Sequence, residues 1–206
     1  MSIEIDKMTR REATLVQAGL KALGVYQGTT KGIPGPKTRA ALATYLDGEA
    51  PSGFAKEMVR LAEGEVGVCE DPVDSNTGRR VRTYQGATWL DGTGWPWCAA
   101  FICWIVREAG MAEEHRPQTA GAWDFERWAR KTTNPAELIK PAATGTIRKG
   151  DLLVYKFSHI GIAREDETGG RVTTIEGNTD GEGSREGGGV WEKSRRVELV
   201  RSIIRI

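Results

Sequence analysis

The spacing of apolar residues divides the chain into a helical first part and a strand-rich second part. In the first part, apolar side chains recur at the three- to four-residue intervals of helices. These segments are residues 9–23, 55–64, 81–84 (a short helix or a turn), 98–109 and 122–131. In the second part, short runs rich in β-branched residues alternate with glycines and charged turns, as strands do. These runs are residues 152–155, 160–163, 172–175 and 202–206. Helices followed by strands predict an α+β fold in which helices pack on an antiparallel sheet.

The same pattern sets off the first 48 residues as a small helical module. The helix over 9–23 is followed by a turn-rich loop, and a second helix begins at Pro36, where a first turn tolerates proline. The stretch Asp47-Gly-Glu-Ala-Pro-Ser-Gly then breaks that helix. We therefore expect a helical module over 1–48, a linker over 49–55 and a main domain over 56–206.

This module resembles a known family. Val16-Gln17, Leu20, residues 23–28 and residues 32–41 follow the pattern of the peptidoglycan-binding-domain-1 repeat, which has two helices joined by a turn and a glycine-rich loop. Lys31 stands where that family usually has Asp. The resemblance implies a module that binds cell wall. The alternative is a helical hairpin that only packs against the main domain.

Composition narrows the class of protein. The 206 residues are 39% hydrophobic and 28% charged, which is typical of a soluble protein with a core. The net charge of +1 gives no reason to expect nucleic acid or an acidic membrane surface as a partner. The sequence starts without the apolar run of a signal peptide and nowhere approaches the ~18 apolar residues of a membrane span. We expect a monomer that is made in the cytoplasm, does not insert into membranes and is carried to its site of action by another route.

Three cysteines and two histidines are the first candidates for chemistry, and the odd cysteine count does not suggest a disulfide framework. Cys98 follows Gly-Trp-Pro-Trp at the predicted start of a helix, where the helix dipole and unpaired first-turn amides stabilise a thiolate. Cys103 lies in the middle of that helix and has the setting of a core cysteine. His115 lies in a polar connector. His159 begins a predicted strand and would project toward the helix that packs on the sheet.

Two polar residues follow at the end of the next predicted strand. A neighbouring strand can bring the Glu176 carboxylate to the His159 ring, where it would fix the tautomer of the imidazole. Asn178 could orient the imidazole instead, or donate its amide to an oxyanion. Gly177 would let the backbone turn tightly between them. The residues favour Cys98 as nucleophile, His159 as base and Glu176, ahead of Asn178, as the third member.

The order of these segments resembles a second family. The segments are Pro-Trp-Cys-Ala-Ala-Phe, Gly-Asp-Leu-Leu-Val-Tyr, His-Ile-Gly-Ile-Ala and Ile-Glu-Gly-Asn-Thr. They resemble the CHAP domain, the cysteine/histidine-dependent amidohydrolase/peptidase family related to papain-like and NlpC/P60 enzymes, over residues 56–206. The resemblance implies a catalytic set of Cys98, His159, Glu176 and Asn178.

The implied activity is hydrolysis of a peptidoglycan amide through a thioester acyl-enzyme. The bond would be N-acetylmuramoyl-L-alanine or one within the stem peptide or cross-bridge. A wall-binding module joined to a wall-cleaving domain is the arrangement of many phage endolysins. A secreted antibacterial effector with the same chemistry is the alternative.

This chemistry needs no cofactor, although some CHAP domains bind calcium before the nucleophile. Residues 70–78 supply carboxylate and amide oxygens and a glycine, without the regular Asp-x-Asp-x-Asp-Gly spacing. Zinc is a weaker alternative, because Cys98 and Cys103 are off the helical spacing of three or four that aligns ligands. Two other classes stay open: a non-catalytic wall-binding protein with inert Cys98 and His159, and a protease that acts on folded proteins.

Overall fold

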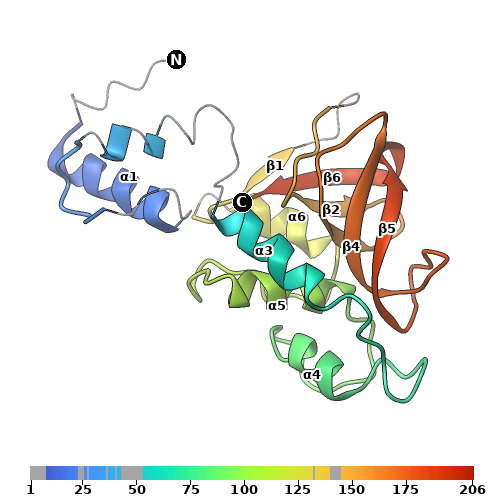
Figure 1. Cartoon of the computed structure of the whole chain (residues 1–206). Coiled ribbons are helices and arrows are strands. Elements are labelled where there is room, and N and C mark those ends of the chain that lie inside the picture. The colour runs from blue at the N-terminus through green and yellow to red at the C-terminus, as the bar shows by residue number, and fades with distance from the viewer. Residues whose placement is uncertain are drawn as a thin grey trace.

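The structure, a computed structural model, describes residues 8–22, 26, 28–35, 37–39, 41–42, 53–131, 133–139 and 145–206. Its helices are α1 (Arg10–Ala22), α3 (Phe54–Glu63), α4 (Arg79–Gln85), α5 (Cys98–Glu108) and α6 (Asp124–Ala129), with a short 3-10 helix η2 (Val197–Leu199). Its strands are β1 (Glu137–Ile139), β2 (Leu152–Tyr155), β3 (Ile160–Ala163), β4 (Arg171–Thr179), β5 (Gly189–Arg196) and β6 (Val200–Arg205). Figure 1 shows α1 apart from a main body of helices and sheet.

The strands form one sheet in the order β1-β6-β2-β3-β4-β5, and each neighbouring pair is antiparallel. The α+β fold with an antiparallel sheet, predicted from the sequence, is confirmed. In the register of β3 with β4, Ile162 lies opposite Ile175. This register places Gly161 opposite Glu176. The close approach of these two residues shapes the site described below.

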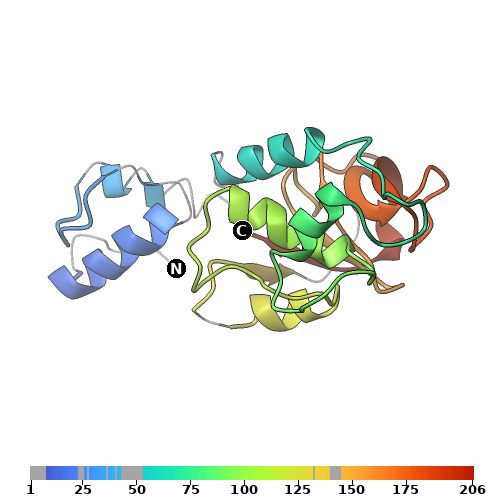
Figure 2. The same ribbon diagram turned by 90° about the horizontal axis from the view of Figure 1, so that it is seen from below.

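Helix α5 is the centre of the helical layer. Residues 98–106 are all buried, because the segment Cys-Ala-Ala-Phe-Ile-Cys-Trp-Ile-Val has no polar face to turn to solvent. The helix packs against β3 and β4 on one side and against α3 and α4 on others. In Figure 2, α5 lies between α3 and α6. Gly110 follows with a φ of 95°, the left-handed conformation expected of a glycine just past a helix end.

The sheet buries side chains on both faces. Along β2, Leu152 and Val154 join the core beneath the helices, while Leu153 and Tyr155 join a second, smaller core on the other face. This alternation is the two-residue period of a strand. Because both faces of β2 are covered, its sequence reads as a continuous apolar run.

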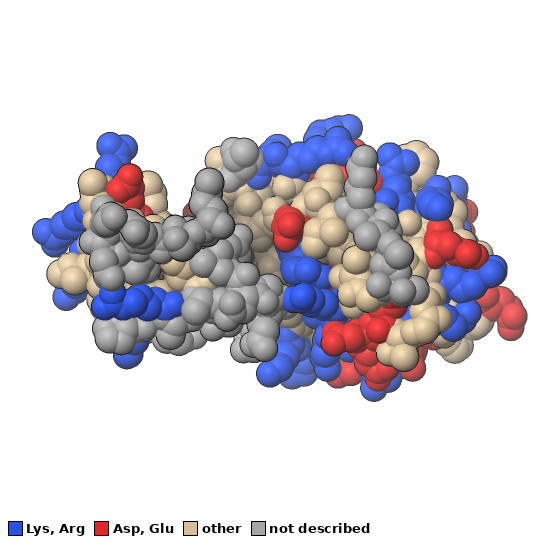
Figure 3. Space-filling model, turned by 90° about the horizontal axis from the view of Figure 1, so that it is seen from above, with Lys and Arg blue, Asp and Glu red and all other residues tan. Residues whose placement is uncertain are grey.

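Charged side chains of both signs are interspersed with other residues on the face that Figure 3 shows. Arg164, just after β3, contacts Glu63 of α3 at 2.9 Å and Glu192 of β5 at 2.5 Å. Exposed pairs of this kind contribute about 0–1 kcal/mol each. Within the described residues, no helix has the length and apolar character needed to cross a membrane.

Most predicted elements agree with the structure to within a few residues, and two strands were missed. Strand β1 is only three residues long, and β5 is a polar edge strand. Helix α3 starts at Phe54, inside the predicted linker, and Phe54 belongs to the main core. Residues 49–52 of that linker, and residues 36, 40 and 43–46 of the predicted second helix, lie outside the described residues.

The first helix belongs to the predicted N-terminal module. Gln17 of α1 is buried and bonds to the segment that follows. Its Oε1 accepts from the Gly32 N–H (2.9 Å), and its Nε2 donates to the Ile33 carbonyl (2.9 Å) in the loop and to the hydroxyl of Thr38 (3.0 Å) in the helical residues beyond it. Gly32 has a φ of 71° and faces the backbone of α1, so only glycine fits there. These contacts account for the glycine-rich loop seen in the sequence.

Candidate active site

Cys98 is the first residue of α5, so its side chain stands at the positive end of the helix dipole. The preceding residue, Trp97, is fully buried and has non-helical backbone angles (φ −119°, ψ 13°). The first-turn amides of a helix have no partners within the helix. A sulfur at this position therefore has backbone N–H groups on its own helix that can stabilise negative charge.

His159 lies just before β3 and is fully buried. Its ring stacks with Tyr155 and Phe157, with centroid distances of 5.9 and 6.0 Å. Cys98 and Glu176 both interact with the imidazole. Burial by itself would lower the pKa of His159, but the charge of an ionised Cys98, contact with its sulfur and the Glu176 carboxylate outweigh burial and raise that pKa to about 9.

Glu176 is the carboxylate beside His159. The His159 Nε2 and the Glu176 Oε2 lie 3.1 Å apart, and both side chains are completely buried. Neither ring nitrogen of His159 makes a hydrogen bond of standard geometry with the described residues, so the contact is an ion pair with imperfect alignment. Nε2 is the ring nitrogen that faces the Glu176 carboxylate, so Nδ1 is the nitrogen that does not face it.

The Glu176 carboxylate has further partners that the sequence did not suggest. Arg195 of β5 donates from Nε to Oε1 (2.9 Å) and from Nη2 to Oε2 (2.6 Å). The hydroxyls of Tyr155 and Thr174 donate to Oε1 at 2.8 and 2.7 Å. Burial alone would raise the pKa of Glu176, but the hydrogen bonds and charges of Arg195 and His159 hold it well below its usual range.

Two glycines make room for this arrangement. A Cβ on Gly161 would lie 2.6 Å from Cγ of Glu176, so only glycine at 161 lets the glutamate side chain cross from β4 over β3. A Cβ on Gly177 would lie 2.8 Å from Trp97 and 2.9 Å from Phe101. Gly177 therefore allows α5 to approach the sheet closely. Residue 177 lies within strand β4, where the pairing with β5 is irregular between Glu176 and Thr179, so the tight turn predicted here is a local irregularity of a strand.

Asn178 contacts the start of α5. Its Oδ1 accepts the backbone N–H of Trp97 at 2.7 Å, and its Nδ2 donates to the Gly187 carbonyl at 2.9 Å and to Oδ1 of Asn76 at 3.2 Å. Its backbone adopts the left-handed conformation (φ 57°), which asparagine tolerates better than most residues. These bonds join β4, the loop before β5 and the segment before Cys98. They commit the amide to Trp97, Gly187 and Asn76.

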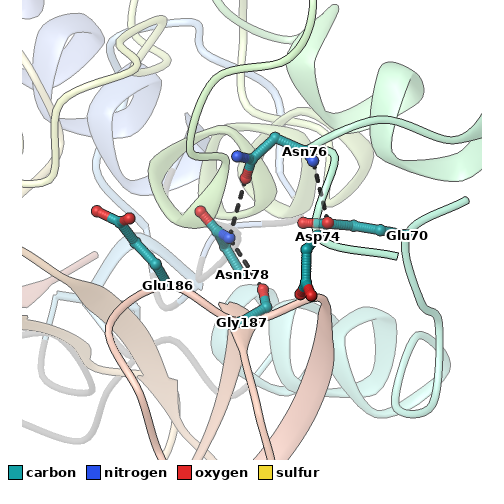
Figure 4. A pocket seen from close by; sticks show the side chains of 6 residues that line it. All are labelled: Glu70, Asp74, Asn76, Asn178, Glu186 and Gly187. Carbon is teal, nitrogen blue, oxygen red and sulfur yellow. Dashed lines mark hydrogen bonds between the residues drawn. The ribbon is translucent and has the colours of Figure 1, made fainter. Parts of the chain in front are cut away.

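Glu70 and Asn76 complete a ring of hydrogen bonds around Trp97. Figure 4 shows the part of this ring that joins Glu70, Asn76 and Asn178. The Trp97 indole N–H donates to Glu70 Oε1 (2.8 Å), and the backbone N–H of Asn76 donates to Glu70 Oε2 (3.0 Å). The Trp97 ring also stacks on Tyr84, with centroids 5.4 Å apart. Both the backbone and the side chain of the residue before Cys98 are thus fixed by polar partners.

A polar pocket opens beside this ring, lined by Glu70, Asp74, Asn76, Asn178, Glu186 and Gly187. A cation in this pocket would compete with Trp97 and Asn76 for the Glu70 oxygens. Within the described part of the chain, no three His, Cys, Asp or Glu side chains come together as a metal site. Calcium binding by residues 70–78 stays a prediction.

The other cysteines and the second histidine lie in different settings. Cys103 is fully buried, and burial raises the pKa of its thiol to about 12, so it stays protonated near neutral pH. Cys69 is exposed, and none of the three cysteines is in a disulfide. His115 lies in the connector after α5, where its carbonyl accepts the Trp128 indole N–H. The structure thus brings Cys98, His159 and Glu176 together, and places Asn178 behind Cys98.

Comparison with known proteins identifies one domain in this chain. A comparison with curated proteins finds no match. The crystal structure of a wild-type endolysin, LysIME-EF1, has 18% sequence identity and a TM-score of 0.49, and the match covers 73% of this chain and 63% of that one. This chain therefore spans less than two thirds of that endolysin. The family model described as "CHAP domain" matches residues 90–178, a range that holds Cys98, His159, Glu176 and Asn178. The chain accordingly contains a CHAP domain at residues 90–178.

Proposed function

We propose that this chain is a cysteine hydrolase that cleaves an amide bond in the peptide part of bacterial peptidoglycan. One observation carries the proposal: a cysteine at a helix start contacts a buried imidazole, which in turn contacts a buried carboxylate. Nucleophile, base and orienting group in this order are the arrangement of nucleophilic amide hydrolysis. The CHAP domain supports peptidoglycan as the substrate.

The roles follow from the positions of the groups. The Cys98 thiolate attacks the amide carbonyl carbon, and the first-turn amides of α5 stabilise the oxyanion that forms. His159 gives its proton to the leaving amine, the C–N bond breaks and a thioester remains on Cys98. His159 then takes a proton from water, whose oxygen attacks the thioester. The C–S bond then breaks, which releases the carboxylic acid and restores the Cys98 thiolate beside the protonated His159.

Glu176 and Asn178 have different parts in this proposal. Glu176 fixes the orientation of the His159 ring and stabilises its protonated form, as an acceptor on a catalytic histidine does. Asn178 holds the backbone of Trp97 and so positions Cys98 from behind. Because its amide is committed to three other groups, Asn178 serves as a positioning residue, and Glu176 is the third member of the catalytic set.

The biological setting is also part of the proposal. Residues 1–48 would bind cell wall and residues 56–206 would cut it, as in an endolysin that is released to the wall. The enzyme would be either an N-acetylmuramoyl-L-alanine amidase or a stem or cross-bridge endopeptidase. An antibacterial effector with the same chemistry is the alternative setting. It shares the site and differs only in the route by which the chain reaches the wall.

The test compares the wild-type chain with Cys98→Ala on purified cell walls. Because the nucleophile is lost, release of free amino groups should fall by at least roughly 1,000-fold. The matched control is Cys69→Ser, which changes an exposed thiol and should keep wild-type activity. Mass spectrometry of the released fragments identifies the bond that is cut.

Three outcomes would contradict the proposal. Wall hydrolysis that survives Cys98→Ala would exclude Cys98 as the nucleophile. A wild-type chain that binds walls and releases no amino groups would instead be a non-catalytic wall-binding protein, and cleavage of casein in place of walls would indicate a general protease.

A further inference from the structure

Arg195 of β5 is a buried arginine whose guanidinium donates two parallel hydrogen bonds to the carboxylate of Glu176. The residue is 9% exposed, and the Glu176 carboxylate beside it is fully buried. The fork of a guanidinium matches the two oxygens of a carboxylate, so this pairing fixes the plane of the carboxylate as well as its charge. With Oε1 and Oε2 both held, Oε2 stays 3.1 Å from Nε2 of His159.

The guanidinium is itself held in place. It lies over the rings of Tyr155 and Phe157, with its central carbon 5.5 Å from each ring centroid. Its third nitrogen, Nη1, donates to the Gly183 carbonyl at 3.1 Å. The same two aromatic rings stack on His159. The rings of Tyr155 and Phe157 therefore contact both His159 and Arg195, the two side chains that bind the Glu176 carboxylate.

The charged and titratable groups around Glu176 come from every element packed against it. Tyr155 faces it from β2, His159 from the start of β3, and Arg195 from β5. Thr174 on its own strand adds a neutral hydroxyl, and Cys98 of α5 interacts with His159. Arg195 is thus the permanently charged group of this set.

We propose that Arg195 is the positioning residue that keeps Glu176 ionised and aimed at His159. A buried carboxylate without a cation takes up a proton, and a protonated Glu176 could no longer stabilise the protonated imidazole. The inference rests on the proposed function only for its catalytic consequence. The ionisation and orientation of Glu176 can be measured without any substrate.

The experiment follows the His159 ring by NMR from pH 3.5 to 7 in Arg195→Gln and Arg195→Lys. The chain has only two histidines, and His115→Gln assigns their signals. In Arg195→Gln, Glu176 should titrate inside this range and give the His159 signal an inflection that the wild type lacks. Arg195→Lys keeps the charge and loses the two-point geometry, so its inflection should be smaller and shifted to lower pH. On purified walls, kcat should fall about tenfold or more in Arg195→Gln, with KM little changed.

The matched control is Arg205→Gln. Arg205 of β6, in the same sheet, also donates two hydrogen bonds to a buried carboxylate. Its Nε bonds Oδ1 of Asp151 at 2.9 Å and its Nη2 bonds Oδ2 at 2.7 Å. This variant should lose stability and leave the His159 titration unchanged. If Arg195→Gln also leaves that titration unchanged, Arg195 is a structural residue only and the proposal fails. If Arg195→Gln does not fold, Arg195→Lys decides in the same way. A shifted His159 titration in a chain that does not hydrolyse walls would refute the proposed function and leave this role of Arg195 in place.

Discussion

The hydrogen bond from Asn178 to Trp97 makes a quantitative prediction about how Cys98 is held. Asn178→Gly removes the side-chain amide and keeps the left-handed backbone (φ 57°) without strain. The variant therefore isolates the three hydrogen bonds of the amide. We expect it to destabilise the fold and to loosen the segment that leads into Cys98.

The magnitude follows from what each bond leaves behind. The Trp97 backbone N–H, now bonded at 2.7 Å, would be left in a buried position without its partner, at a cost of about 1–3 kcal/mol. The bonds to Gly187 and Asn76 border an open pocket, where water can replace the amide, and together add about 1 kcal/mol. The free energy of unfolding should fall by about 2–4 kcal/mol. For a chain of this size, that is a fall in Tm of roughly 10 °C.

Urea unfolding followed by tryptophan fluorescence measures this change. The matched control is Asn76→Gly, a second left-handed asparagine (φ 52°) whose side chain supplies only the longest of the three bonds, at 3.2 Å. That control should cost less than about 1 kcal/mol. If Asn178→Gly is no less stable than Asn76→Gly, the bond to Trp97 does not hold the helix start, and the reasoning is refuted.

Two more predictions follow from the site. A folded-state pKa of about 9 for His159, raised despite burial by the neighbouring sulfur and carboxylate, favours its protonated form. That stabilisation is fully present below the ordinary pKa of 6.5 and is lost as the pH rises through about 9. Urea midpoints measured between pH 6 and 9.5 should therefore reveal an alkaline loss of up to about 3 kcal/mol that His159→Asn lacks. An equal loss in both chains would contradict this pKa. Gly177→Ala should cost about 1–3 kcal/mol and reduce wall hydrolysis, because its Cβ would press on Trp97 and Phe101. Gly181→Ala, whose Cβ would come no nearer than 4.0 Å to any atom, is the control in thermal unfolding; equal Tm values for the two variants would exclude close packing at Gly177.

The pattern of apolar residues in the sequence was sufficient to predict most helices and strands of the fold. Residues 98–106 are apolar on every side, and a helix of this kind is stable when it is buried, as α5 is against the sheet. The strands β2 and β3 were predicted at their observed bounds, because β-branched runs between glycines and charged turns have few other solutions. Local sequence was also sufficient to single out Cys98 at the helix start.

Strand β5 is an element that the pattern of apolar residues did not predict. Its sequence, Gly-Val-Trp-Glu-Lys-Ser-Arg-Arg, is mostly polar, because residues 191–194 and 196 are exposed or half-buried. Arg195 fills a buried position in place of an apolar residue. A buried arginine needs a partner for its charge, and here that partner is a buried carboxylate. Its partner, Glu176, lies on the neighbouring strand β4, so the pair could be recognised only once the register of the sheet was known.

The sequence by itself determined the helices, most of the strands and the residue types suited to nucleophilic chemistry, because local periodicity and helix ends are local properties. Only the tertiary structure decided which polar groups pair. It assigned Glu176 to both His159 and Arg195, Asn178 to Trp97, and gave Gly161 its steric role beside Glu176. The physical reason is that a buried polar group must find its partner across the core, and that partner is set by strand register and helix packing, which no short stretch of sequence encodes.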